Sequence, residues 1–413
     1  MSAFAIPLSG LAASSASLNV IANNLANLNT DGYKDETLNF SDVFNQVSGV
    51  AGNGDPIQVG SGVQTSGESS NFTNGTLTTT GVDSNMALQG NGFFVVQNSS
   101  GQTAYTRSGD FTVNSQGQLS TPQGQLVMGY PAVNGVVSTS TGLTPISVNQ
   151  AANIPAEPTS TFSMNTNLNA ASSVGATYSA PVTVYDSLGA THVLTVDYTN
   201  LGSNSWSYSI SVPSADTGGT GTPTPVATGT MSFNASGELT SPSGSVTGIT
   251  ISGLADGANP MNLTWSLADS SGNPTITQQS ATSATASTAQ NGYGVGALTG
   301  YSVQPDGTVE GQFSNNQTLA LGQVAVANFA NDQGLSQVGG NDYQATFASG
   351  TAVVGIAGTG GNGSITGDAV EQSNVNLSAE FANMIVAQQS YEANAKVLTT
   401  LNQVSQATLQ MMS

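Results

Sequence analysis

The residue types that most often carry chemistry are scarce in this sequence. His192 is the only histidine, and cysteine is absent from all 413 residues. Thiolate nucleophiles, thiolate zinc sites and disulfides are therefore excluded. A single histidine, without cysteine, is also too little to predict a catalytic triad or a histidine-based metal site. We interpret His192, on an expected strand over 191–199, as a core or edge residue with satisfied hydrogen bonds.

Two other patterns resemble functional motifs without the context they need. Residues 358–363 match G-x-G-x-x-G, but Ser-Ile-Thr-Gly follows instead of a helix, so we do not expect a nucleotide site. The 23 acidic residues are scattered through turns, for example at Asp110, Asp186 and Asp306, where aspartate accepts local backbone hydrogen bonds. Nothing marks a carboxylate pair in an apolar cleft. The sequence predicts no enzyme, no catalytic residue, no cofactor and no metal.

The charge balance excludes two classes of partner. Lys34, Arg107 and Lys396 are the only basic residues, and the formal net charge is -20. Three scattered cations cannot form a phosphate-binding stripe or a polybasic membrane anchor, so we expect no nucleic-acid partner. We also expect no membrane insertion, because no segment reaches about 18 apolar residues. Residues 1–20 lack the basic start and compact apolar core of a cleavable signal peptide.

Glycine and proline divide the chain into helical ends and a β-rich middle. The sequence holds 49 Gly and 15 Pro, yet neither occurs over 11–31 or over 368–413. These two residues break regular structure, so both ends are predicted to be helices and the middle to be strands and turns. The expected fold is mainly β with terminal α-helices, in a nested multi-domain chain. Coiled-coil-like N- and C-terminal helices would accompany two β-rich domains.

Both predicted helices carry apolar residues at alternating spacings of three and four, the heptad pattern of a coiled coil. Each line of apolar positions forms a seam along its helix. Few residues of the same chain are expected to cover these seams, so we expect the seams to pack between copies. Two amphipathic helices packed on a globular core are the alternative. Polar seam positions and poor helix formers predict that each helix is mostly unfolded in a free subunit and folds on assembly. The predicted seam residues are Leu8, Leu11, Leu18, Leu25, Leu377, Phe381, Met384, Tyr391 and Leu398.

The middle of the chain alternates in the manner of half-buried antiparallel strands. Trp206, Tyr208, Ile210 and Val212 share one face of an expected strand, and serines occupy the other. The alternating strands predict a separate middle domain, and a Ser/Thr/Ala-rich segment after them is interpreted as the linker that leads back to the rest of the chain. These two features define the predicted domains. They are a terminal helical domain (1–30 and 373–413), an extended connector (31–70), a β-rich inner domain (71–154 and 289–372) and an outer β-sandwich or barrel (155–288).

Both ends also match long motifs. Residues 22–34 read A-N-N-L-A-N-L-N-T-D-G-Y-K, and residues 388–397 read Q-Q-S-Y-E-A-N-A-K-V. Each closely resembles a terminal signature of the bacterial flagellar rod and hook axial proteins. Interior segments 184–192 and 314–318 are similar to hook proteins, although Asn316 stands where that turn usually has Gly. Without the middle domain, a distal-rod-like subunit could not be separated from a hook subunit.

The resemblance implies a self-assembling, extracellular flagellar tube. It implies export by the type III apparatus without a cleaved signal, and a homopolymer that forms a curved, torque-transmitting joint. Partners would be the rod, the hook cap and the hook–filament junction proteins. Near the end of the first helix, four asparagines could cap backbone groups or cross-link neighbours, or simply mark fraying: Asn23, Asn24, Asn27 and Asn29. An extracellular β-rich fibre or adhesin stays as an alternative, and a glycan-active enzyme is a weaker one.

Overall fold

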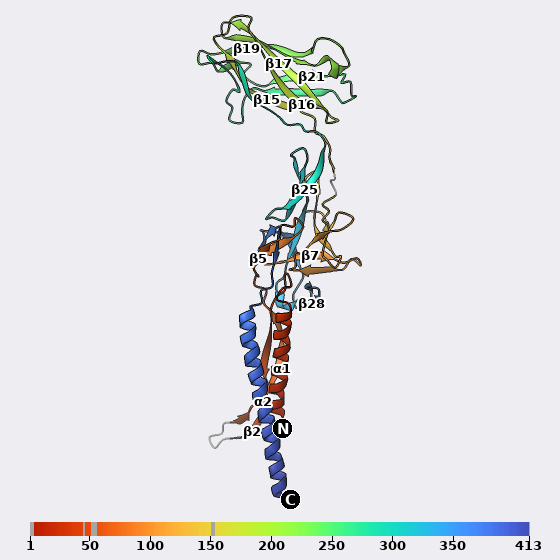
Figure 1. The fold of residues 1–413 in the computed structure, drawn as a ribbon, viewed down its shortest axis with the longest axis vertical. Coiled ribbons are helices and arrows are strands. Elements are labelled where there is room, and N and C mark those ends of the chain that lie inside the picture. Colours follow the sequence, from red (N-terminus) through yellow and green to blue (C-terminus); the bar gives the residue numbers. More distant parts are fainter. Residues whose placement is uncertain (1–3, 44–45, 51–55, 150–152, 413) are drawn as a thin grey trace. The chain divides into compact units, whose positions relative to one another are not determined.

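The computed structural model describes residues 4–43, 46–50, 56–149 and 153–412 (Figure 1). The chain divides into two compact units. The first comprises 1–150, 301–311 and 319–413, and the second comprises 151–300 and 312–318. The predicted fold class is confirmed, because many strands lie between an N-terminal and a C-terminal helix.

Two long helices lie side by side in the first unit (Figure 1). Helix α1 spans Ala5–Ala26 and ends before the Asn-Thr-Asp-Gly segment at 29–32, whose residue types favour a turn. Helix α2 spans Leu377–Met412. Asn376 caps α2: its Oδ1 accepts the N–H groups of Ser378 and Ala379 at 3.1 and 3.2 Å.

Helix α1 corrects one expectation. Its 22 residues are long enough to cross a membrane by length and composition, and an 18-residue window has a mean hydropathy of 1.4, which leucine, isoleucine, valine and alanine supply. Serine and asparagine interrupt the apolar residues, so a count of consecutive apolar residues does not reveal this helix. In the structure, α1 packs on α2 and on the strands β1 (Glu36–Asp42) and β4 (Val63–Ser70).

The predicted connector contains antiparallel ribbons. Strand β1 pairs with β4 from Glu36 opposite Ser70 to Asp42 opposite Val63, with a bulge after Asn39. A second ribbon joins β2 (Gln46–Val50) and β3 (Pro56–Val59). Since α1 lies on the β1–β4 ribbon, this part of the chain braces the helix.

The rest of the first unit is a β-domain built from both halves of the chain. Its main sheet places β27 (Thr318–Asn328) beside β11 (Leu126–Val133), and continues through β7 (Phe93–Gln97), β8 (Thr103–Thr106), β29 (Asp342–Gln344) and β28 (Ser336–Gly339). The smaller strands are β5 (Leu77–Thr79), β6 (Met86–Gln89), β9 (Thr112–Val113), β10 (Leu119–Ser120), β12 (Val136–Val137), β13 (Thr144–Pro145), β26 (Thr308–Phe313), β30 (Val353–Ile356), β31 (Ser364–Gly367) and β32 (Ala369–Glu371), with a 3₁₀ turn η2 (Asp332–Gly334).

Aromatic rings from distant segments meet in the core of this domain. The ring of Phe93 packs edge-on against those of Phe72 and Phe329, with centroids 5.5 and 5.8 Å apart. Tyr105 meets Phe329 in the same manner at 4.8 Å. Such T-shaped contacts add to the apolar area that the rings bury. They fasten residues before 110 to residues after 320.

The second unit is a β-sandwich. One sheet orders β16 (Thr177–Tyr185), β17 (Thr191–Gly202), β18 (Ser205–Val212), β19 (Thr224–Phe233) and β20 (Leu239–Ser241). The other orders β21 (Val246–Ile251), β22 (Met261–Ser266), β15 (Thr161–Asn169) and β23 (Ile276–Gln279), with β24 (Ala284–Gln290) also on β15. A 3₁₀ turn, η1 (Ser214–Thr217), follows β18, and β14 (Asn153–Ile154) pairs with the start of β25 (Gly296–Val303).

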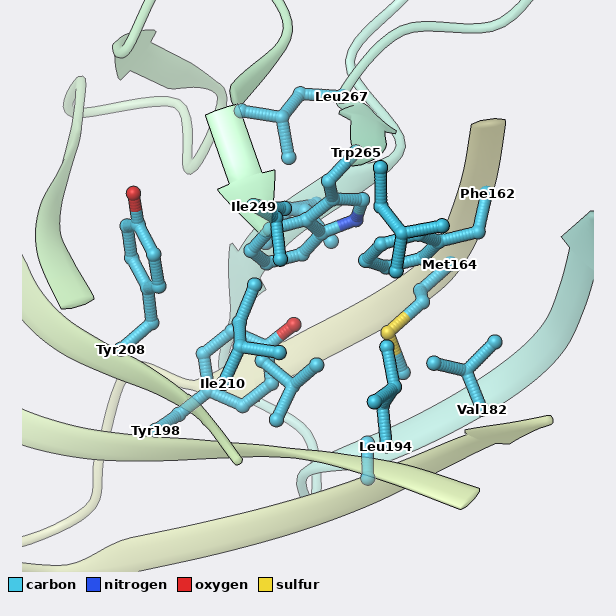
Figure 2. Close-up of a cluster of buried hydrophobic side chains, with 14 of the residues drawn as sticks. Phe162, Met164, Val182, Leu194, Tyr198, Tyr208, Ile210, Ile249, Trp265 and Leu267 are labelled. Carbon is cyan, nitrogen blue, oxygen red and sulfur yellow. The ribbon is translucent and has the colours of Figure 1, made fainter. Parts of the chain in front are cut away.

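Side chains from both sheets fill the space between them (Figure 2). Trp265 lies at the centre, stacked on Phe162 with ring centroids 5.9 Å apart and edge-on to Tyr208 at 5.5 Å. The predicted alternation on β18 is confirmed, because Trp206, Tyr208, Ile210 and Val212 are all buried. Period-two alternation thus directs one face of each strand inward.

The turn over 314–318 explains the one departure from the hook pattern noted in the sequence. Asn316 has a φ of 59°, in the left-handed region. Glycine enters this region without strain, and asparagine is among the few other residues that tolerate it. The substitution therefore keeps the local backbone.

Candidate self-assembly surface

Helices α1 and α2 run antiparallel and touch along most of α1. At one end, a Cβ on Gly10 would lie 2.8 Å from the Asn394 amide, so the helices approach closely there. At the other end, Asn24 of α1 interacts with Glu380 of α2. Helix α1 buries Ala13, Val20 and Ile21 in this packing. The helices therefore pack on each other within the chain, where the sequence predicted few companions and packing of the seams between copies.

The predicted seam residues are nevertheless poorly covered by their own chain. Leu8 is 59% exposed and Phe381 is 50% exposed. Leu377 and Tyr391 are also exposed, whereas the remaining seam residues are half-buried: Leu11, Leu18, Leu25, Met384 and Leu398. At 100° per residue, Met384, Tyr391 and Leu398 lie on the same side of α2 as Ala387, which is buried, and Asn394, which lies against Gly10, whereas Phe381 is rotated away from that side.

The four asparagines have different surroundings. Asn24 is buried and bonds the backbone of Glu36 twice: its Nδ2 donates to the carbonyl at 2.8 Å, and its Oδ1 accepts the N–H at 3.0 Å. Asn27 donates from Nδ2 to the Asn23 carbonyl at 3.0 Å. Asn23 and Asn29 are exposed. Asn24 and Asn27 thus bind backbone groups of their own chain, one of the roles that the sequence left open.

A groove of about 560 Å³ lies between α1, α2 and β1. Val20, Leu38, Val386 and Ala387 supply much of its apolar lining, and Glu380 lies at its wall. Burial raises the pKa of the Glu380 carboxyl, and the nearby Asp35 charge adds to this, although hydrogen bonds with Asn24 and Asn383 oppose it. Its Oε2 atom is buried without a hydrogen-bond partner. Polar side chains, among them Ser14, Ser17 and Glu36, also line the groove, and the charged form of the Glu380 carboxyl is disfavoured there.

A second apolar stripe on α2 was missed in the sequence. Val386, Val397, Val404 and Met411 are 64, 49, 58 and 88% exposed. At 100° per residue they fall on one side of the helix, roughly opposite the predicted seam. Their spacings of seven and eleven residues match the helical repeat. The sequence therefore contained this second stripe, but the stronger pattern of leucine and aromatic residues obscured it.

The last three turns of α2 have no cover from α1. Since Gly10 lies against Asn394, the start of α1 is level with residues near 399, and α2 continues to Met412 (Figure 1). Residues 402–411 are all exposed, including Leu409 at 66%. A long helix with apolar stripes on two sides and a solvent-exposed end is typical of a subunit that packs against further helices.

Comparison with known proteins decides between the hook and rod interpretations. The chain is 37% identical to the "Flagellar hook protein FlgE" of Escherichia coli K12 over 97% of this chain and 98% of that protein. The chain belongs to the flagellar hook protein family. It is also 37% identical to the hook protein of Salmonella typhimurium LT2, again over 97% and 98%. With that of Treponema pallidum it shares 31% identity over 95% and 96%.

Four family descriptions match successive segments. The basal body rod protein family matches 6–34, the hook protein FlgE/F/G D1 domain matches 87–167, the FlaE D2 domain matches 153–293 and the FlgEFG C-terminal family matches 367–411. The crystal structure of Helicobacter pylori FlgE2 is similar in fold, with a TM-score of 0.52 at 15% identity over 70% of this chain and 98% of that one. The chain is a non-enzymatic structural subunit of the flagellar hook, in the bacterial flagellum.

Proposed function

We propose that copies of this chain form the hook tube through α1 and α2, with the exposed apolar stripes of α2 as the principal contact between copies. The single observation that carries the proposal is the exposure of Val397, Val404 and Met411 on a helix that also packs on α1. Burying apolar side chains stabilises association by about 25 cal/mol per Å² before the entropic cost of assembly is subtracted.

The two-sided character of α2 supports a tube rather than a closed dimer. One side of α2 is used within the chain by α1, and Val397, Val404 and Met411 on the other side are exposed and available to a second copy. A contact between unlike surfaces repeats from copy to copy and gives a ring or a helical filament. Helices packed in this way would line the tube, consistent with residues 1–30 and 373–413 as its inner domain.

The remaining segments would carry the outer parts of the joint. We assign 31–70 to a connector, 71–154 with 289–372 to an inner β-domain and 155–288 to an outer domain. Rigid β-domains on such connectors would let neighbouring subunits shift while the inner helices hold, so that a curved tube bends and still transmits torque. At its ends the tube would meet the rod, the hook cap and the hook–filament junction proteins, and the type III apparatus would export the subunits.

Val404→Glu in the full-length chain tests the contact. The substitution places a charge on the apolar stripe, and the matched control Gln403→Glu adds the same charge to an exposed neighbour on another side of the helix. We expect V404E to remain in the supernatant after centrifugation under conditions in which wild type and Q403E form tubes visible by electron microscopy.

Circular dichroism would show whether both variants keep the wild-type fold as subunits. If V404E forms tubes as readily as Q403E, the stripe of Val397, Val404 and Met411 is not the contact between copies, and the proposal is wrong.

A further inference from the structure

The only histidine lies in a cluster of carboxylates in the second unit. Nε2 of His192 is 3.1 Å from Oδ2 of Asp186 and 3.9 Å from Oδ2 of Asp256. Its other ring nitrogen, Nδ1, lies 2.9 Å from Oδ2 of Asp216. These residues come from β17, from the turn before it, from η1 and from the loop after β21. The sandwich therefore brings four side chains from distant positions to one imidazole.

Backbone hydrogen bonds hold the carboxylates in place. Oδ1 of Asp186 accepts the N–H groups of Leu188 and Ala190 at 2.8 and 2.9 Å, which leaves Oδ2 directed at His192. Oδ1 of Asp256 accepts the Ala258 N–H at 3.0 Å. The two loops are joined as well, since the N–H of Ala255 donates to the Asp216 carbonyl at 2.8 Å. Backbone groups of the fold thus hold the Asp186 and Asp256 carboxylates in place, in addition to the contacts that these side chains make with His192.

The cluster is short of positive charge. Three carboxylates surround one imidazole, so two negative charges remain uncompensated even when His192 is protonated. Lys34, Arg107 and Lys396, the only other cationic side chains, all belong to the first unit.

The distances suit a divalent transition metal. Zinc binds imidazole nitrogen and carboxylate oxygen at about 2.0–2.2 Å, which in a tetrahedron places donor atoms roughly 3.3–3.5 Å apart. The donor atoms of Asp186, His192 and Asp256 all lie within 4.8 Å of one another, and two of the separations are 3.1 and 3.9 Å. Ligating histidines usually donate their other N–H to a carboxylate, the position that Asp216 holds.

We propose that His192 Nε2, Asp186 and Asp256 bind one Zn²⁺ ion, with Asp216 orienting the imidazole and water completing the coordination. The charge of the ion would balance the two ligating carboxylates. The site would fasten the β16–β17 turn to the loop after β21 at one edge of the outer sandwich. The sequence could not show this, because Asp216 and Asp256 lie 24 and 64 positions from the histidine and carry no recognisable spacing.

Equilibrium dialysis of the full-length, chelator-treated chain against ZnCl₂ tests the site. We expect one Zn²⁺ per chain, with X-ray absorption showing one nitrogen and otherwise oxygen ligands. Asp256→Asn removes a partly exposed ligand and should weaken binding more than tenfold. Asp216→Asn should weaken it by about 10–100-fold, the usual effect of losing such a supporting carboxylate.

Asp269→Asn is the matched control, because Asp269 is an exposed turn residue of the same unit and asparagine keeps its backbone hydrogen bonds. It should bind zinc as wild type does. A tenfold excess of Ca²⁺, which does not favour imidazole, should not displace the zinc. Equal zinc binding by wild type and D256N, or no binding by wild type, would overturn the proposal. In the second case His192 is an imidazolium that pairs directly with Asp186 and Asp216.

Discussion

Lys34 and Glu371 stand 337 positions apart in the sequence, yet Lys34 Nζ lies 2.7 Å from Glu371 Oε1 with both side chains fully buried. Arg107 Nη1 approaches the other carboxylate oxygen at 3.5 Å. Two of the three basic residues of the chain thus share one glutamate inside the first unit. The arrangement joins the segment after α1, the β-domain and the segment before α2.

Glu371→Gln should therefore be strongly destabilising. It leaves Lys34 and Arg107 buried without a counter-charge, a loss of about 3–5 kcal/mol for a broken buried ion pair. Urea denaturation of the full-length subunit, followed by far-UV circular dichroism, would measure it. Glu392→Gln on the exposed side of α2 is the control and should change the unfolding free energy by no more than about 0.5 kcal/mol. Equal stability of the two variants would mean that the ion cluster contributes little.

A close approach of two backbone segments gives a second prediction. Gly32 has a φ of 71°, and a Cβ there would lie 2.5 Å from the backbone nitrogen of Ser108. Gly32→Ala should lower the free energy of unfolding by about 1–2 kcal/mol, because alanine is strained in the left-handed conformation. The contact of the added Cβ with the Ser108 backbone should lower it by about 1–3 kcal/mol more. Gly81→Ala separates the two effects, because Gly81 has a φ of 69° with nothing within 4 Å of the added Cβ.

The difference in melting temperature between G32A and G81A reports the clash alone. We expect G32A to melt clearly below G81A in thermal unfolding of the subunit. Similar melting temperatures would show that the Ser108 backbone moves aside without cost.

The buried carboxyl group at the α1–α2 contact predicts a pH dependence. Burial raises the pKa of Glu380 above its ordinary 4.5. A carboxyl whose folded pKa is raised stabilises the fold while protonated, and this contribution is lost as the pH rises through the folded pKa. Glu380→Gln should therefore become stabilising relative to wild type as the pH increases from 4 to 8. The loss of the favourable interaction between the Glu380 charge and the N-terminal helix dipole works against this gain.

Thermal unfolding of wild type and E380Q across that pH range provides the measurement. A melting-temperature difference that grows with pH in favour of E380Q is the expected result. A difference that shrinks with pH would show that the charged carboxylate is favoured in the folded subunit.

Local signals in the sequence predicted much of the fold. Asn376 marks the start of α2 because its side chain can accept N–H groups of the first turn, and the alternation around Trp206 marks β18 because successive side chains point to opposite faces. The contact of Lys34 with Glu371 and the convergence of Asp256 on His192 could not be predicted, since each depends on how distant segments pack. The exposed leucine and aromatic positions were identified, but the pairing of α1 with α2 was not.

The exposed end of α2 supports the last prediction, on order in the free subunit. An isolated helix gains little from propensity alone, and most of its stability comes from packing an apolar face. Residues 402–411 are exposed, and Asn402 and Ser405 are poor helix formers. We expect their amides to exchange rapidly with deuterium in the subunit and slowly in the assembled tube. Residues 13–24 of α1, which pack on α2 and β1, should show measurable protection already in the subunit, rather than the nearly complete unfolding that the sequence predicts.

Hydrogen exchange read by mass spectrometry on both states, with sedimentation velocity to verify the monomer, would decide the matter. The V404E variant serves as the control, because it should keep the subunit pattern under conditions in which wild type assembles. Strong protection over 402–411 in a verified monomer would mean that this end is ordered without a second copy. In that case α2 would not fold on assembly, and the exposed stripe would contact a second copy from a helix that is already formed.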